Sequence, residues 1–161
     1  MRLSDHFYLY EFTRSQLASR HALANHPNEP QIDALRLLCR HALEPVRAHF
    51  NVPIKPSSGF RCVALNRLLG SRDTSSHCAG EAVDFELMGV ANVQLAHWVA
   101  DNLQFDQLIL EYPQADNPHG GWVHLSYRRH GNRAQCLTRD ANGYRRGLPR
   151  VLERFQSVRK P

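Results

Sequence analysis

The stretch from Ser75 to Asp84 restricts the fold of this chain more than any other, because it must leave a loop and enter a strand. His77 and Asp84 lie seven positions apart, a spacing that would place both on one face of a helix. Gly80 between them opposes a helix, and residues 83–87 alternate apolar and charged side chains as a strand does. We therefore predict His77 on a loop and Asp84 on the strand that follows.

An imidazole and a carboxylate are both ligands that zinc accepts, but two ligands do not make a site. The third candidate is His124, in a second strand-like run over residues 120–127. A catalytic zinc ion usually has three protein ligands and keeps one position open. We therefore predict one Zn2+ per chain, held by His77, Asp84 and His124. Cys78 adjoins His77, but neighbouring side chains on extended backbone point apart, so we leave Cys78 out of the site.

Length and composition restrict the class of protein. The 161 residues, 42% of them hydrophobic, suit one soluble domain with its own core, and the formal net charge of +5 indicates either solubility or an anionic partner. No apolar run approaches the roughly 20 residues needed to cross a bilayer. Residues 1–7 lack the apolar core of a signal peptide, so we expect synthesis in the cytoplasm. The four cysteines form no CxxC pair and are expected to be reduced thiols.

Hydrophobic periodicity and turn residues predict the order of the elements. We expect short helical turns within residues 3–20 and a long helix over 31–50, in which Pro45 either kinks the helix or starts a new segment. A short strand and turn are expected over 51–61. Further helices are expected over 63–69, over 93–103 with Asn92 as its cap, and over 149–157. Strands are expected at 105–112 and 122–128, with 134–138 as the hairpin partner of the second.

The motif residues resemble a known family. Ser75-x-His77 with Asp84 seven residues on, followed by Trp122-Val123-His124, is similar to the zinc D-Ala-D-Ala carboxypeptidases and endolysins of peptidase family M15. The resemblance extends to residues 57–61 and 108–112 and covers residues 1–140, with 141–161 as a basic tail that belongs to the domain or extends from it. It implies a single α+β domain of the hedgehog and D-Ala-D-Ala peptidase type. In that fold an antiparallel sheet carries the zinc site and helices pack around it.

The general base departs from the pattern of the family. Many members carry an acidic residue three positions before the last zinc histidine, and that position here is Gly121. The nearest substitute is Glu111, which follows the apolar residues 108–110, where burial would raise the pKa of its carboxyl group. We predict that Glu111 is the catalytic base and acid, against the alternative of a solvated glutamate at a strand end. His119 is the reserve candidate.

Four further residues are predicted to contact the substrate. The resemblance implies that Arg61 binds a substrate carboxylate or stabilises the developing oxyanion, although a salt bridge with Glu81 or Asp84 is an alternative. It implies the same kind of contact for Ser75, whose hydroxyl could instead cap the local turn. Trp122 and Ser126 alternate with His124 by period two and should share its face of the sheet, where Trp122 could line the cleft or fill the core.

The function that the resemblance implies is zinc-dependent hydrolysis of an amide bond in peptidoglycan stem peptides, by a phage or prophage enzyme that is a monomer. Carboxypeptidase and endopeptidase activities both fit. Without a signal peptide, such an enzyme would reach the cell wall through a holin or as part of a virion. The alternative is a non-catalytic zinc-binding module, for instance a phage structural or cell-wall-binding protein. Specific nucleic-acid binding is not expected, because the basic tail matches no binding motif.

Overall fold

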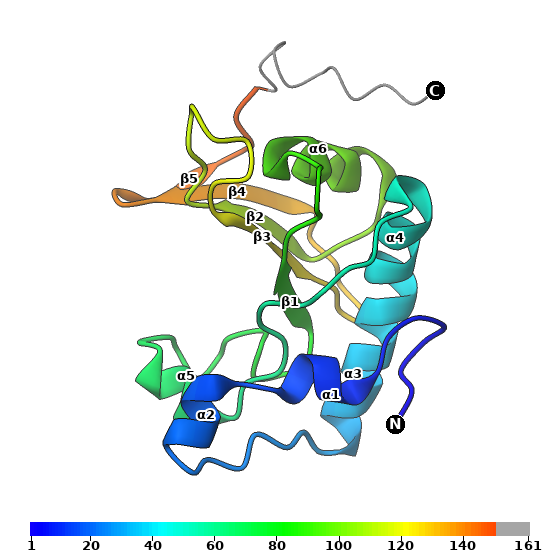
Figure 1. The fold of residues 1–161 in the computed structure, drawn as a ribbon, viewed down its shortest axis with the longest axis vertical. Helices are drawn as coiled ribbons and strands as arrows, with labels where there is room; N and C mark the ends of the chain where they lie inside the picture. Colours follow the sequence, from blue (N-terminus) through cyan, green and yellow to red (C-terminus); the bar gives the residue numbers. More distant parts are fainter. Residues whose placement is uncertain (151–161) are drawn as a thin grey trace.

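The computed structural model describes residues 1–150. The helices are α1 (Leu9–Thr13), α2 (Gln16–Arg20), α3 (Glu29–Leu38), the π-helical segment η1 (Cys39–Leu43), α4 (Glu44–Phe50), α5 (Val63–Leu68) and α6 (Asn92–Asn102). The strands are β1 (Ala82–Phe85), β2 (Gln107–Glu111), β3 (Trp122–Ser126), β4 (Gln135–Asp140) and β5 (Gly143–Arg146). Figure 1 shows the sheet with α4 and α6 on one side, and the short helices α1, α2 and α5 beyond β1. The predicted α+β domain is confirmed.

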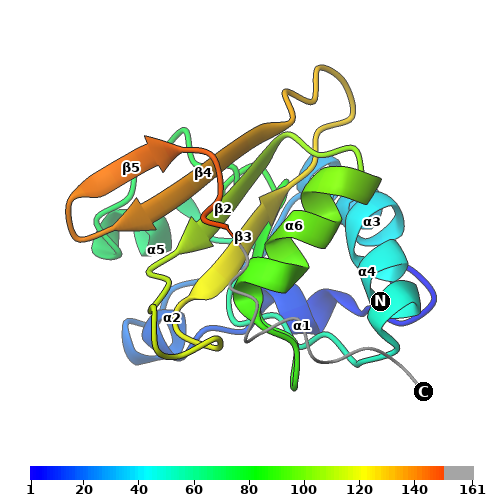
Figure 2. The ribbon, with the colours of Figure 1, turned by 90° about the horizontal axis from the view of Figure 1, so that it is seen from above.

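The sheet has the order β1-β3-β2-β4-β5 and is mixed, whereas an antiparallel sheet was predicted (Figure 2). β3 pairs antiparallel with β1 and β2, while β4 pairs parallel with β2 and antiparallel with β5. The predicted hairpin between 122–128 and 134–138 is therefore wrong. The physical reason is that β3 already has a neighbour on each side, and β4 joins the sheet at the edge of β2 instead.

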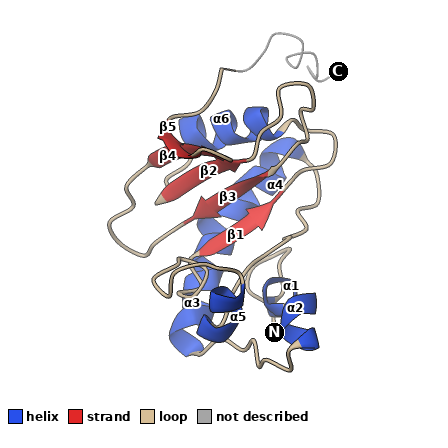
Figure 3. Ribbon diagram, turned by 90° about the vertical axis from the view of Figure 1, so that its left-hand side faces the viewer, coloured by secondary structure: helices blue, strands red, loops and turns tan. Residues whose placement is uncertain are grey.

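The two faces of the sheet differ in character because side chains alternate along each strand. One face is apolar and fully buried, and its side chains are those of Val83, Phe85, Leu108, Leu110, Val123 and Leu125. Helix α6 packs on β2 and β3, and Figure 3 shows α4 and α6 behind the strands. The hydrophobic core therefore lies between this face and the helices. The opposite face carries the polar residues of the candidate site.

The long helix predicted over residues 31–50 is divided into three segments. Asn28 caps α3 by accepting a hydrogen bond from the backbone N–H of Gln31. The helix then widens into η1, where the N–H of Glu44 donates to the carbonyl of Cys39. Pro45 follows at once and has no N–H to donate. The wider turn before Pro45 accommodates its ring, so the predicted disturbance takes the form of a π-helical segment.

Two local predictions are wrong. Residues 52–56 form no strand, and a single bridge joins Ser58 to Asp84. Pro53 and Pro56 each lack the N–H that a paired strand needs. Asn92 does not cap α6, since the N-cap is Ala91. The Asn92 side chain instead donates to the carbonyl of Gly121 at 3.1 Å, which ties the start of α6 to the start of β3.

The remaining predictions concern the membrane, the cysteines and the C-terminal segment. Within residues 1–150, no helix combines the length and the apolarity needed to cross a bilayer. All four cysteines are free thiols. β5 adds residues 143–146 to the sheet. The helix predicted over 149–157 falls, beyond residue 150, outside the described residues.

Candidate metal centre

His77 lies in a tight turn that follows α5 and leads into β1. Gly80 closes this turn at a φ of +75°, and a Cβ there would collide with the backbone carbonyl of Gln31, so only glycine fits. The Gln31 side chain donates to the carbonyl of Cys78 at 2.9 Å, which fixes the turn against α3. His77 Nδ1 lies 2.7 Å from the carbonyl oxygen of Gly59. This contact places the N–H on Nδ1 and leaves the Nε2 lone pair free to bind a metal.

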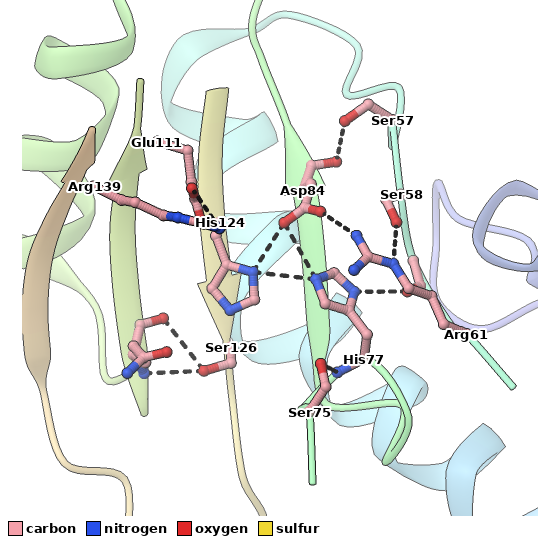
Figure 4. Close-up of polar contacts among 12 residues, drawn as sticks. Ser57, Ser58, Arg61, Ser75, His77, Asp84, Glu111, His124, Ser126 and Arg139 are labelled. Carbon is pink, nitrogen blue, oxygen red and sulfur yellow. Dashed lines mark hydrogen bonds and ion pairs between the residues drawn. The ribbon is translucent and has the colours of Figure 1, made fainter. Parts of the chain in front are cut away.

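Asp84 is the third residue of β1 and faces His124 directly across the β1–β3 pair. Arg61 holds one carboxylate oxygen, with Nη2 2.7 Å from Asp84 Oδ2. The guanidinium is itself fixed by the Ser58 hydroxyl, which accepts from Arg61 Nε at 2.9 Å. Asp84 Oδ1 is left to point at the two histidines (Figure 4). The structure thus contains the salt bridge that the sequence offered as the alternative role of Arg61.

The three predicted ligands come together at one point. His77 Nε2 lies 3.2 Å from His124 Nδ1, and Asp84 Oδ1 lies 3.3 Å and 2.9 Å from these two nitrogens. Zinc bonds of about 2.0–2.2 Å in a tetrahedron would separate the ligand atoms by roughly 3.3–3.6 Å. The observed separations lie at or just below this range, so small shifts of the side chains would admit a zinc ion at the centre of this group. Among the described residues, this is the one group of three or more such side chains that could hold a metal ion.

The electrostatics of the group also favour a cation. Burial lowers the pKa of His77, so its imidazole stays neutral and able to bind a metal. Burial alone would raise the pKa of Asp84, but the neighbouring His77 and His124 hold it well below its usual range. Asp84 is therefore ionised at any ordinary pH. One carboxylate and two imidazoles, all nearly buried, form a donor set that a divalent cation would complete.

Glu111 lies on the same face of the sheet as the ligands. Ile109 is the direct neighbour of His124 across the β2–β3 pair, and Glu111 is two residues further along β2. The Glu111 side chain is buried, being 7% exposed, so the alternative of a solvated glutamate is wrong. Burial raises the pKa of its carboxyl group, while the guanidinium of Arg139 opposes this rise. Arg139 Nη1 lies 3.4 Å from Glu111 Oε2.

Arg139 was missed by the sequence analysis. Its position next to Glu111 follows from the parallel pairing of β4 with β2, in which these two residues are direct neighbours. The predicted hairpin of β4 with β3 would have separated them. The only signal in the sequence was an arginine in a strand-like run near the C-terminus, and that signal indicates no partner.

The backbone at position 121 explains why a glycine stands there and not an acidic residue. Its φ is +75°, and a Cβ there would collide with the backbone carbonyl of Glu111. An acidic side chain at position 121 would therefore require the backbone to move. Trp122, the next residue, is the direct neighbour of Glu111 across the β2–β3 pair. Glu111, on the adjacent strand, stays the predicted substitute for an acidic residue at position 121.

The other predicted site residues lie near the ligands, and each already has a local contact. The Ser75 hydroxyl accepts from the backbone N–H of His77 at 3.3 Å, which is the turn-capping alternative. The Trp122 ring packs against Tyr112, with centroids 5.6 Å apart. Their contacts with substrate, and that of Arg61, stay predictions.

Ser126 and His119 are less well placed for chemistry. The Ser126 hydroxyl is buried and bonds to the backbone of Gln107, accepting from its N–H at 3.0 Å and donating to its carbonyl at 3.3 Å. Ser126 therefore joins β3 to β2, and its predicted contact with substrate stays a prediction. His119 is exposed in the loop between β2 and β3, and it is not one of the three clustered ligands.

Comparison with known protein families gives one finding. A family model described as Peptidase M15 matches residues 5–126, which include all three candidate ligands and Glu111. No curated protein matches the chain. The matched range ends with β3, so it excludes Arg139 and the whole β4–β5 hairpin.

Proposed function

The chain belongs to the peptidase M15 family, and from this premise we propose that it hydrolyses an amide bond in the stem peptides of bacterial peptidoglycan. The observation that carries the proposal is the meeting of four side chains at one face of the sheet, three from its strands and that of His77 from the turn before β1. The ligand atoms of His77, Asp84 and His124 all lie within 4.8 Å of one another. The buried carboxyl group of Glu111 lies on the neighbouring strand of the same face. Family membership supports the peptide-type substrate.

Zinc is the metal that the ligand set favours, because two imidazoles and one carboxylate form a common catalytic zinc donor set that leaves a position open. His77, Asp84 and His124 would hold the ion. When bound, it would act as a Lewis acid towards the scissile carbonyl group and the attacking water. Gly59 and Arg61 support two of these ligands through their contacts with His77 Nδ1 and Asp84 Oδ2.

Glu111 is the proton carrier in this proposal. It takes a proton from the attacking water as the water oxygen adds to the scissile carbonyl carbon, and it delivers that proton to the leaving nitrogen as the C–N bond breaks. The products are a carboxylic acid and an amine, and Glu111 returns to its ionised form. Burial in the apolar context of β2 raises its pKa towards the range that a base and acid near neutral pH requires.

Metal content and peptidoglycan digestion, measured on the same preparations, test this function. Wild type is expected to contain close to one zinc ion per chain and to release new amine termini that mass spectrometry identifies. His124→Ala should lose both the zinc and the cleavage. His26→Ala is the matched control, since it removes an exposed imidazole that is neither a candidate ligand nor a candidate base, and it should leave both the zinc and the cleavage unchanged. Zinc-loaded wild type that cleaves no stem-peptide bond would contradict the proposal, and so would a chain that never binds zinc.

A second variant separates the enzyme from a non-catalytic zinc-binding module. Glu111→Gln keeps the metal ligands and removes the proton carrier, so it should retain zinc while kcat falls by about 10²–10⁴-fold. Glu29→Gln, at the exposed start of α3, controls for the loss of a charge. Full activity in Glu111→Gln together with lost activity in His119→Ala would transfer the role of proton carrier to His119.

The identified products would also distinguish carboxypeptidase from endopeptidase cleavage. We further propose that the enzyme reaches the cell wall through holin-type release or as part of a virion.

A further inference from the structure

Glu111 and Arg139 are held side by side by the parallel pairing of β2 and β4. They are direct neighbours in the register, and both side chains project from the face that carries His124. Arg139 Nη1 lies 3.4 Å from Glu111 Oε2. Figure 4 shows the guanidinium reaching along the sheet to the carboxylate, which in turn lies beside His124. The base is thus placed between the candidate metal ligands and a cation.

Two tyrosine rings hold the guanidinium in place. Its central carbon lies 5.5 Å from the ring centroid of Tyr112 and 5.1 Å from that of Tyr144, distances typical of cation–π contacts. Tyr144 is the direct neighbour of Arg139 on β5. The backbone of Tyr112 donates to the carbonyl of Arg139 at 2.7 Å. Arg139 is therefore fixed from both sides and along its own backbone.

Tyr112 adopts a strained backbone conformation at this point. Its φ is +49°, in the left-handed region, which costs a bulky residue about 1–2 kcal/mol. In a regular strand, residue 112 would face away from the side on which Glu111 lies. The left-handed turn instead leaves its ring beside Trp122 and within reach of Arg139. Strain of this kind is typically retained where a functional arrangement requires it.

The charged groups around Glu111 explain why it needs a fixed partner. Arg139 on β4 and His124 on β3 favour its ionised form, whereas burial and Asp84 on β1 oppose it. Of these groups, Arg139 alone is free of a role as a candidate metal ligand. A buried carboxylate without such a partner would be protonated or would turn towards solvent.

We propose that Arg139, clamped between Tyr112 and Tyr144, is a positioning residue that holds the Glu111 carboxylate in place for proton transfer. The inference rests on the proposed function of this site. In this inference, the activity of the site requires two residues that lie outside the range matched by the family model, because Arg139 and Tyr144 both belong to the β4–β5 hairpin.

Variants of the clamp test this proposal by kinetics. Arg139→Met keeps the length of the side chain without its charge, and we expect kcat to fall about 10–100-fold while KM and zinc content stay within about twofold of wild type. The acid limb of the kcat/KM profile should move to higher pH, because the Glu111 carboxyl group loses its cation. Arg139→Lys should restore part of kcat. Tyr144→Leu should lower kcat, whereas Tyr144→Phe keeps the ring and should behave as wild type.

The outcomes separate this inference from the proposed function. Wild-type kcat and an unshifted profile in Arg139→Met would overturn the positioning role, and so would a raised KM with unchanged kcat, which would indicate a substrate contact. Titration of the Glu111 carboxyl group by carbon-13 NMR in the zinc-loaded protein repeats the test without substrate. A higher pKa in Arg139→Met supports the clamp even if no peptide is cleaved, and an unchanged pKa refutes it even if cleavage occurs.

Discussion

Replacing Gly121 by alanine should damage this protein far more than the same change at Gly131. The two glycines have almost the same φ, +75° and +72°, both in the range that L side chains rarely adopt. They differ in their surroundings. A Cβ at Gly121 would collide with the carbonyl of Glu111, whereas a Cβ at Gly131 would meet nothing within 4 Å. The pair therefore separates the cost of the collision from the cost of the conformation.

The magnitudes follow from these two contributions. A side chain in the left-handed region costs about 1–2 kcal/mol, and this cost applies to both variants. Relieving an overlap with packed backbone adds about 1–3 kcal/mol, and this cost applies to Gly121→Ala alone. The free energy of unfolding should therefore fall by roughly 1–2 kcal/mol in Gly131→Ala and by roughly 2–5 kcal/mol in Gly121→Ala.

Activity provides a second and independent measure of the same collision. The carbonyl that must move belongs to Glu111, and a displacement of about 1 Å in a catalytic group can cost on the order of 10²-fold in rate. Urea denaturation gives the two unfolding free energies, and peptidoglycan digestion gives the two rates. Equal losses of stability in the two variants would refute the collision. Wild-type activity in Gly121→Ala would show that the backbone near position 121 does not position the base.

Three further predictions concern the ligands, the N-terminal segment and the metal. Arg61→Met should weaken zinc binding by about 10–100-fold, because Asp84 Oδ2 loses its partner. Competition with a chelator measures the zinc affinity, and an unchanged affinity would refute the support of Asp84 by Arg61. Burial raises the pKa of Glu44, but hydrogen bonds from Ser4 and His6 lower it overall. The ionised Glu44 carboxylate therefore contributes to the free energy of unfolding above an unfolded-state pKa of about 4.3, and this contribution is lost as pH falls through the lower folded pKa. Urea denaturation of wild type and Glu44→Gln should therefore differ at neutral pH and converge in acid, and a constant difference would contradict this. Zinc at 100 times its Kd should raise the free energy of unfolding by about 2.7 kcal/mol over the chelated protein. A Tm that changes neither on addition of zinc nor on addition of chelator would exclude a bound ion.

The elements that carry the candidate ligands could be predicted, because the information that places those elements is local. The spacing of His77 and Asp84, with Gly80 between them, indicated a loop and a strand, and the structure has both. His124 was placed on a strand by the alternation around it, and that strand exists. Each of these inferences depended on a few neighbouring residues, whose backbone preferences are strong.

The arrangement of β4 could not be predicted, because it depends on which sheet edge is open. Local alternation identifies a strand but does not identify its neighbour. The direct pairing of Glu111 with Arg139 is a consequence of that choice. The π-helical segment before Pro45 was likewise beyond reach, since a proline permits either a kink or a widened turn. The role of Asn92 was missed because its partners, the carbonyls near Gly121, are distant in sequence.

The β4–β5 hairpin has a consequence for the solubility of the chain. A protein cut after Ser126 would keep every candidate ligand and the whole range matched by the family model. It would also leave β2 as a bare edge, with the backbone donors and acceptors that now pair with β4 open to other chains. Such an apolar edge is a template for aggregation. The hairpin that supplies Arg139 therefore also protects the sheet from self-association, so the domain that folds is longer than the domain that sequence comparison recognises.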